Sequence, residues 1–101
     1  VYVEAAKAFA RTILEQPENG IEQRIDNAFR RATSRAPTST ELALLRSLYE
    51  AQIADAKSKP DDVSRLVADF ELPPSIDRTA FAAWYAVCTA ILNLDETITK
   101  G

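Results

Sequence analysis

The segment 80–92 reads AFAAWYAVCTAIL, which is apolar on almost every side when it is drawn as a helix. A helix without a polar face normally has other elements around it. The segment is also too short to cross a bilayer, which takes about 20 apolar residues. It therefore predicts a central helix, and its many alanines would let neighbouring helices approach closely.

Four other segments have the apolar spacing of amphipathic helices, and none alternates with the period of a strand. Proline and glycine separate them, and we expect helices over 2–16, 20–34, 39–59 and 60–70, followed by the central helix. Their expected inward-facing sets are Val3, Ala6, Phe9, Ala10, Ile13 and Leu14; Ile21, Ile25, Ala28, Phe29 and Ala32; Leu42, Leu45, Leu48, Tyr49 and Ile53; and Val63, Leu66, Val67 and Phe70. The expected solvent face of the first helix holds Glu4, Lys7, Arg11 and Glu15.

Helix starts are marked by capping residues. Thr38 with Glu41 three residues later has the spacing of a capping box, in which each side chain bonds the other's backbone amide. Asn19 with Glu22 has the same spacing. Pro60 suits the first position of a helix, and Asp77 is expected to cap the central one. The second and third helices should form an angled pair about Pro37.

Charge and composition exclude several classes of function. The 101 residues carry 12 basic and 15 acidic side chains, a net charge of -3, which argues against nucleic acid and anionic membranes as partners. The chain has no His and no Met, and its one Cys cannot form an internal disulfide. The chain begins at Val1 and contains no Met, so we expect it to be a piece of a larger protein.

Three stretches resemble one family of large planctomycete proteins. The central stretch, AFRRATSRAPTSTEL over 28–42, is similar to a recurrent Arg-x-Pro-Thr phrase followed by a helix that begins with Glu-Leu. The opening YVEAA over 2–6 and the closing AILNLDE over 90–96, preceded by Trp84, resemble runs that flank this phrase. Ser34 stands where the family often has Gly, so a left-handed helix end is less favourable there.

The family is the C-terminal part of a domain of unknown function, found in proteins that commonly also carry a cytochrome-c-type domain. The resemblance implies an exported or periplasmic multidomain parent, and it supplies no catalytic residues. Any haem would lie elsewhere in the parent, because this segment has no Cys-x-x-Cys-His motif and neither His nor Met as an axial ligand. No cofactor is expected in this segment.

One polar cluster is predicted from the family-like parts of the chain. Carboxylates near a helix C-terminus oppose the helix dipole, which makes Asp95 and Glu96 unusual. We expect Arg31 or Arg35 to pair with them, with Asn93 beside the pair. The role predicted for this cluster is structural. The alternative is an active site built on the two carboxylates.

Other candidate sites have ordinary structural explanations. Arg24, Arg31 and Arg35 share one flank of the second helix and could bind an anion, but their stems would also cover apolar surface, while Arg30 can pair with Asp26. Residues 50–77 carry seven acidic and three basic side chains without a calcium-loop motif, so no metal site is predicted. A Ser-His-Asp triad is impossible without His, and a core position is predicted for the thiol of Cys88.

The sequence thus predicts an all-α fold, with residues 1–101 forming one domain of about five helices around the C-terminal one. No catalytic constellation is present within the chain. The function expected is a non-catalytic helical module that docks on other domains of its parent or on a protein partner. The alternative is one wall of an enzyme whose catalytic residues lie upstream. Nucleic-acid binding is disfavoured by the charge, and no membrane insertion is expected.

Overall fold

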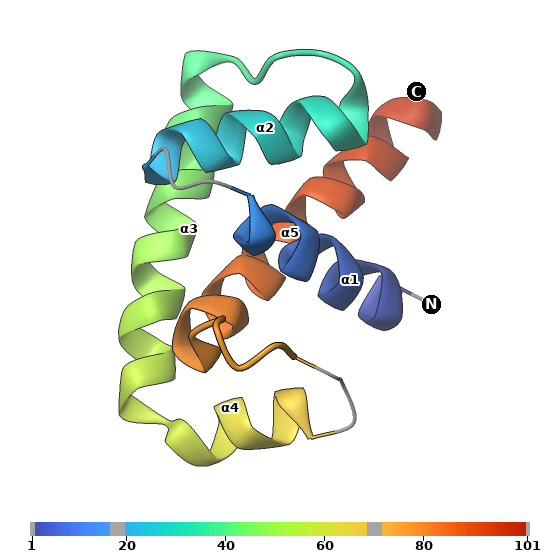
Figure 1. Ribbon diagram of the computed structural model, residues 1–101. Helices are drawn as coiled ribbons and strands as arrows, with labels where there is room; N and C mark the ends of the chain where they lie inside the picture. Colours follow the sequence, from blue (N-terminus) through green and yellow to red (C-terminus); the bar gives the residue numbers. More distant parts are fainter. Residues whose placement is uncertain (1, 17–19, 69–71, 101) are drawn as a thin grey trace.

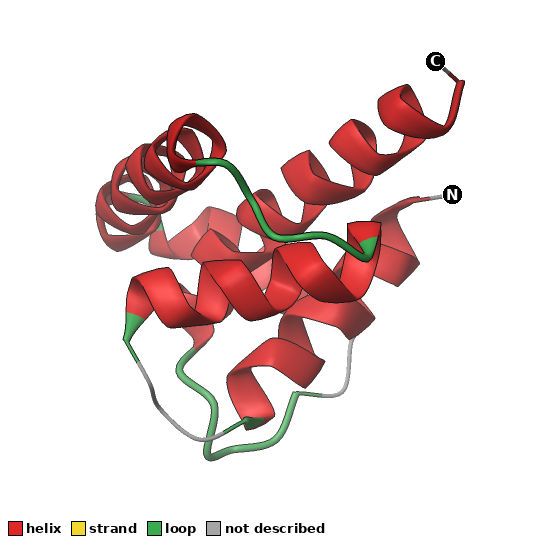
Figure 2. Cartoon of the chain, turned by 90° about the horizontal axis from the view of Figure 1, so that it is seen from above, coloured by secondary structure: helices red, strands yellow, loops and turns green. Residues whose placement is uncertain are grey.

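The computed structural model describes the backbone of residues 2–16, 20–68 and 72–100, and the side chains of 5–16, 20–68 and 72–94. The described residues form five helices and no strand, which confirms the all-α prediction (Figures 1 and 2). The helices are α1 Tyr2–Glu15, α2 Ile21–Thr33, α3 Ser39–Ser58, α4 Pro60–Val67 and α5 Arg78–Lys100.

Helix α5 is the centre of the bundle, as its apolar sequence predicts. It contacts each of the other four helices, with α1 crossing it, α2 above, α3 along one side and α4 below in the view of Figure 1. The two views agree that its last turns project beyond the other helices (Figures 1 and 2). The apolar first part of α5 therefore lies inside the bundle, and its C-terminal end lies outside.

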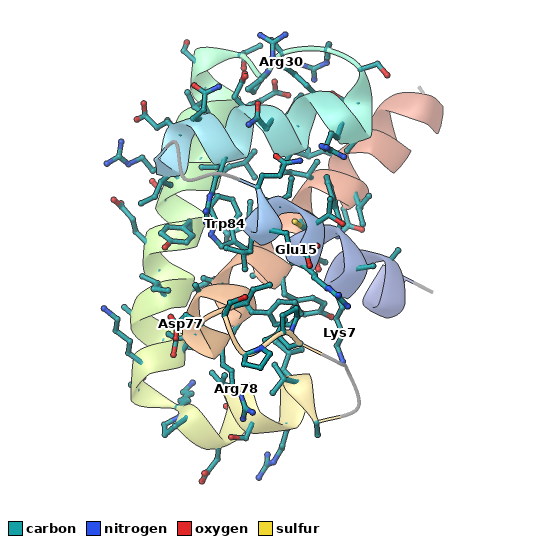
Figure 3. The ribbon with its side chains drawn as sticks, in the orientation of Figure 1. Lys7, Glu15, Arg30, Asp77, Arg78 and Trp84 are labelled. Atoms are coloured by element: carbon teal, nitrogen blue, oxygen red, sulfur yellow. The ribbon has the colours of Figure 1, made fainter. Side chains whose placement is uncertain are left out.

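The core is built on the large side chains of α5 and the stripes that face them. Trp84 is 1% exposed and lies in the middle of the molecule (Figure 3). The ring of Tyr49 packs against it with a centroid distance of 5.0 Å and a tilt of 42°. Other fully buried members of this core include Ile13, Ile25, Phe29, Phe81, Val87 and Ile91. Burial of each such side chain contributes roughly 1.5–3 kcal/mol to folding.

Helix α1 corrects one detail of the sequence analysis. Lys7, expected on the solvent face, is only 8% exposed. Its side chain extends from α1 toward the side of the molecule where α4 lies (Figure 3). The prediction was wrong because α1 packs closely on α5 and buries the small residues Ala6 and Ala10. Lys7 lies at the edge of this apolar stripe and is buried with it. A lysine tolerates such a position because its aliphatic stem can lie along apolar surface.

The start of α2 corrects a second detail. Its N-cap is Gly20, at φ 92°, and among the described residues no side-chain hydrogen bond caps it. The N-cap expected at Asn19 is therefore wrong by one residue, and Asn19 itself, with the capping box expected from it, lies outside the described residues. Glycine suits this junction because it adopts positive φ without the steric penalty of a Cβ atom.

The other predicted helix starts are confirmed. The Glu41 amide donates to Thr38 Oγ1 at 3.1 Å, and the Thr38 amide donates to Glu41 Oε1 at 2.9 Å, which completes the capping box. Pro60 begins α4. The Ala80 amide donates to Asp77 Oδ2 at 3.2 Å, so Asp77 caps α5. Phe70, expected on the inward face of the fourth helix, lies outside the described residues.

Candidate functional site

The turn between α2 and α3 contains the most densely connected polar groups that the structure describes. Ser34 ends α2 in the left-handed conformation, with φ 65° and ψ 16°, and its amide donates to the Arg30 carbonyl at 2.9 Å. The Thr33 hydroxyl donates to the Phe29 carbonyl at 2.8 Å. The left-handed helix end that a glycine would favour is thus formed by a serine.

Arg35 and Glu41 close this turn. Arg35 Nη1 and Nη2 donate to Glu41 Oε1 and Oε2, both at 2.9 Å, in a two-pronged ion pair. The same guanidinium donates to the Ala36 carbonyl at 3.1 Å and lies 4.8 Å from the centre of the Phe29 ring. The arginine therefore links the end of α2, the start of α3 and the edge of the core.

The charge of Glu41 is strongly stabilised. The pKa of its carboxyl is lowered to about 2, first by the hydrogen bonds from Arg35 and then by the hydrogen bond from the Thr38 amide. Hydrogen bonds to the ionised form of a carboxyl favour that form. Glu41 is therefore a fixed anion at neutral pH, and its role in this turn is structural.

The predicted polar cluster is only partly described. Arg31 is exposed in the last turn of α2, and Asn93 is exposed on α5. The side chains of Asp95 and Glu96 lie outside the described residues, so their pairing with Arg31 or Arg35 stays a prediction. The partner that the structure does show for Arg35 is Glu41, which the sequence analysis considered only as a capping residue.

The arginine flank of α2 does not converge on one point. Arg24 lies in the first turn, where it lines a hollow with Asp77, whereas Arg31 lies in the last turn. Seven residues of helix separate them by about 10 Å along the axis. Arg30 points away from the bundle (Figure 3) and donates to Asp26 at 2.9 Å, which confirms the predicted pair.

Cys88 is a core thiol, as predicted. It is 0% exposed on α5, and burial raises the pKa of its thiol to about 12. A nucleophilic cysteine reacts as the thiolate, and burial in apolar surroundings suppresses that form. Cys88 therefore acts in packing in the folded state.

A groove lies where α3, α4 and α5 meet. It has a volume of about 240 Å3. Its apolar lining is Ala56, Val63, Leu66, Ala82, Tyr85 and Ala86, and we call this set the groove floor. Its polar lining is Gln52, Asp55, Lys59 and Asp62, which we call the groove rim. The volume is below the roughly 300–1,000 Å3 typical of small-molecule sites.

The groove exists because two helices turn sharply at one residue. Lys59 alone separates α3 from α4. The Lys59 amide donates to the Ala56 carbonyl at 3.3 Å, and the Lys59 carbonyl accepts from the Asp62 amide at 3.1 Å. With Pro60 at the first position of α4, the chain turns at once, and the two helices form two walls with α5 between them. Sequence patterns could not reveal the groove, because it depends on how three helices are placed.

Lys59 also sits on the groove rim as a cation. Its Nζ lies 3.1 Å from Asp55 Oδ1. The pKa of Lys59 is raised, first by its hydrogen bond to Asp55 and then by the charge of Asp55, with a smaller contribution from the charge of Asp62. Two carboxylates on the rim therefore attract the same ammonium group.

A second hollow, of about 390 Å3, lies at the start of α2. Gly20, Ile21, Glu22 and Gln23 line it together with Arg46 of α3. Arg46 forms an ion pair with Glu22 and another with Glu50 at 3.5 Å. Arg46 therefore balances the charge of Glu22, the one carboxylate among the described residues that line this hollow.

Among the residues that the structure describes, none of the helices has the length and apolar composition that crossing a membrane requires. Within the same residues, no three His, Cys, Asp or Glu side chains are grouped so that they could hold a metal ion.

Comparisons with known protein families, with curated proteins and with solved structures find no match to this chain. The resemblance to planctomycete proteins therefore stays a prediction.

Proposed function

We propose that this chain is a non-catalytic helical interaction module that docks on another domain of its parent protein or on a protein partner. The observation that carries the proposal is the groove between α3, α4 and α5, which combines an apolar floor with a charged rim. An apolar centre inside a polar border is the usual anatomy of a protein interface.

Tyr85 strengthens this interpretation. It is a partly exposed aromatic residue of α5, and it lines the groove floor. Tyrosine is enriched among the residues that contribute most to binding energy at interfaces. Helical alanines beside it, Ala82 and Ala86, leave space for a partner side chain. The rim residues supply charge and an amide around this floor, but no activated nucleophile.

The proposal extends to the setting of the module. The family resemblance supports an exported or periplasmic parent protein, with this segment near its C-terminus and any haem in another domain. The coding sequence upstream of Val1 tests this directly. A signal peptide and a Cys-x-x-Cys-His motif there would support the proposal, and an upstream sequence with neither would contradict it.

The docking function is tested by NMR titration of the isotope-labelled chain with the upstream part of its parent, prepared as a separate polypeptide. We expect chemical shift changes centred on the amides of Ala82, Tyr85 and Ala86. Ala86→Arg, which places a long cation in the groove, should weaken binding at least tenfold. Ala8→Arg on the exposed surface of α1 is the matched control and should bind like the unmodified chain.

Circular dichroism of both variants separates loss of the groove from loss of the fold. Binding that survives Ala86→Arg in a folded protein would contradict the proposed use of the groove. No binding to any upstream domain, together with shifts that do not change, would contradict docking within the parent protein.

A further inference from the structure

Leu44 and the groove are complementary, but a single molecule cannot bring them together. Leu44 is 66% exposed, more than any other large apolar side chain that the structure describes. The groove has an apolar floor and a volume of about 240 Å3, which leaves room for a side chain of this size. Leu44 and Ala56 of the floor are about 18 Å apart along the axis of α3, so Leu44 does not reach the groove of its own chain. A second copy of the chain can join the two.

An antiparallel pair of α3 helices places each Leu44 at the level of the other copy's groove. Helix α3 lies along one edge of the bundle (Figure 1), so part of its surface is open to a second copy. About a two-fold axis, residues equally far before and after the axis lie at the same level. The midpoint of Leu44 and Ala56 is position 50, and so is the midpoint of Glu41 and Lys59. One axis at this level therefore aligns both pairs.

The charges at the two ends of α3 are complementary in this arrangement. Glu41 and Lys59 are about five helical turns apart, so they lie on the same side of α3. Glu41 already accepts bonds from Arg35 and from the Thr38 amide, and Lys59 already pairs with Asp55. Neither pair has to break, because a carboxylate has about four acceptor positions and an ammonium group has three donors. Across the contact Glu41 would lie between two cations, and Lys59 between two anions.

The middle of the contact side has no charge that would oppose its own copy. A residue on a two-fold axis faces its counterpart in the other molecule, so a charged residue there would meet a like charge. Leu48, Ala51 and Gln52 occupy this side of α3 near the axis, and all three are uncharged. Glu50 lies on the opposite side of the helix, where it pairs with Arg46. The side of α3 beside the groove is therefore self-complementary.

We propose that this chain associates with a second copy of itself through antiparallel α3 helices, with each Leu44 seated on the groove floor of the other copy. This inference rests on the proposed docking function and names the partner at that groove. The same surface serves on both molecules, so the contact closes as a dimer. One helix pair with two leucine contacts is a small interface, and we expect weak association at high protein concentration.

Two complementary substitutions test the arrangement by sedimentation equilibrium. Leu44→Glu removes the apolar side chain from an exposed position, and Ala86→Arg fills the groove. Each variant alone should associate more weakly than the unmodified chain by about tenfold or more, because the buried leucine contacts are lost. An equal mixture of the two should regain association. One contact then seats Leu44 in an intact groove, and the other sets the new carboxylate against the new guanidinium.

Matched controls separate this contact from general effects of charge. Ala8→Glu, on the exposed surface of α1, should associate like the unmodified chain. Lys59→Gln should weaken association about 2- to 5-fold, as expected for loss of exposed charge pairs. Lys57→Gln removes the same charge from another side of α3 and should have little effect. Circular dichroism checks the fold of each variant. If Ala86→Arg does not fold, Leu44→Glu on the surface decides alone.

The outcomes separate this inference from the proposed function. A chain that stays monomeric at about 1 mM, where even a weak contact is populated, would overturn the second copy as partner. Association unchanged by Leu44→Glu would overturn it too, and a mixture that associates no better than its components would overturn the two-fold arrangement.

The upstream domain supplies the other comparison. If that domain binds at the groove while the chain stays monomeric, docking stands and self-association is wrong. If the chain associates through Leu44 but no upstream domain binds, self-association stands and docking within the parent protein is wrong. If neither occurs, both proposals fail.

Discussion

The two ends of α3 turn the chain by different means. At its N-terminal end, residues 34–38 form a turn held by side chains, with the capping box of Thr38 and Glu41 and the ion pair between Arg35 and Glu41. At its C-terminal end, Lys59 alone makes the turn into α4, and no side chain caps that helix. The first turn is specified by polar groups and the second by backbone geometry and Pro60.

This difference shows where polar side chains fix the geometry of this fold. The side-chain network lies where α2 and α3 must meet at a fixed angle beside Phe29 in the core. The turn at Lys59 leaves its polar groups exposed beside a groove. We therefore expect substitutions in the first turn to cost stability and substitutions in the second to change binding.

The largest effect is expected for Glu41→Ala. It removes the cap of the Thr38 amide and both bonds from Arg35, and should lower the free energy of unfolding by about 1.5 kcal/mol. Urea denaturation measures the loss. Glu50→Ala, which breaks only an exposed pair with Arg46, should change stability by less than about 0.5 kcal/mol. Equal losses in both variants would mean that the turn is not specified by its polar groups.

The charge-dependent part of that effect should appear as a pH dependence. The pKa of Glu41 is lowered in the folded state to about 2 from an ordinary value of 4.5. A lowered folded-state pKa gives stability that is fully present above the unfolded pKa and is lost as the pH falls. The unmodified chain should therefore lose more stability between about pH 4.5 and 2 than Glu41→Gln does. Parallel curves for the two proteins in urea denaturation at each pH would contradict the assigned pKa.

Thr38→Ala should lower the free energy of unfolding by about 1 kcal/mol, because it removes the oxygen that accepts from the Glu41 amide. Thr38→Ser keeps that oxygen and should recover most of the loss. Thermal denaturation of the pair gives the comparison. A Ser variant as unstable as the Ala variant would show that the threonine acts through its methyl group instead.

Ser34→Gly should raise the free energy of unfolding by about 0.5 kcal/mol. The left-handed conformation at Ser34 costs a residue with a Cβ atom roughly 1–2 kcal/mol, and the greater freedom of glycine in the unfolded chain offsets part of the gain. Ser64→Gly in the exposed interior of α4 is the control and should be destabilising by a similar amount. A loss of stability in both variants would argue against the left-handed end of α2.

The smallest effect is expected at the other end of α3. Lys59→Ala removes an exposed ion pair with Asp55, and should change stability less than any other substitution in this series. Urea denaturation measures this change beside that of Thr38→Ala. A loss as large as that for Thr38→Ala would remove the contrast between the two turns.

Local signals account for most of the fold that the sequence predicts. Thr38, Pro60 and Asp77 fix helix starts through bonds within a few residues, and the unbroken apolar run of α5 marks the centre. Lys7 was misplaced because its burial depends on how α1 lies on α5, which helical spacing does not contain. The start of α2 was misplaced because a glycine at positive φ can replace a side-chain cap.

The candidate site was far less predictable. Nothing in the neighbourhood of Tyr85 along the chain connects it to Lys59 or Asp62. Those residues come together only when α3, α4 and α5 pack against one another. The ion pair of Arg35 with Glu41 was more predictable than the groove, because a capping box brings the Glu41 side chain back over the turn that contains Arg35. A search for cations within reach of a capping glutamate would have found it.

The burial of Cys88 makes the reactivity of its thiol a measure of how often the core opens. The chain has a single thiol, which is sealed in the core with its pKa raised to about 12, so a thiol reagent can modify it only in molecules whose core has opened. Under native conditions the labelling rate reports how often that happens, without denaturant and without any engineered probe. Every variant described above keeps Cys88, so the labelling rate of this thiol ranks the variants by how often their cores open.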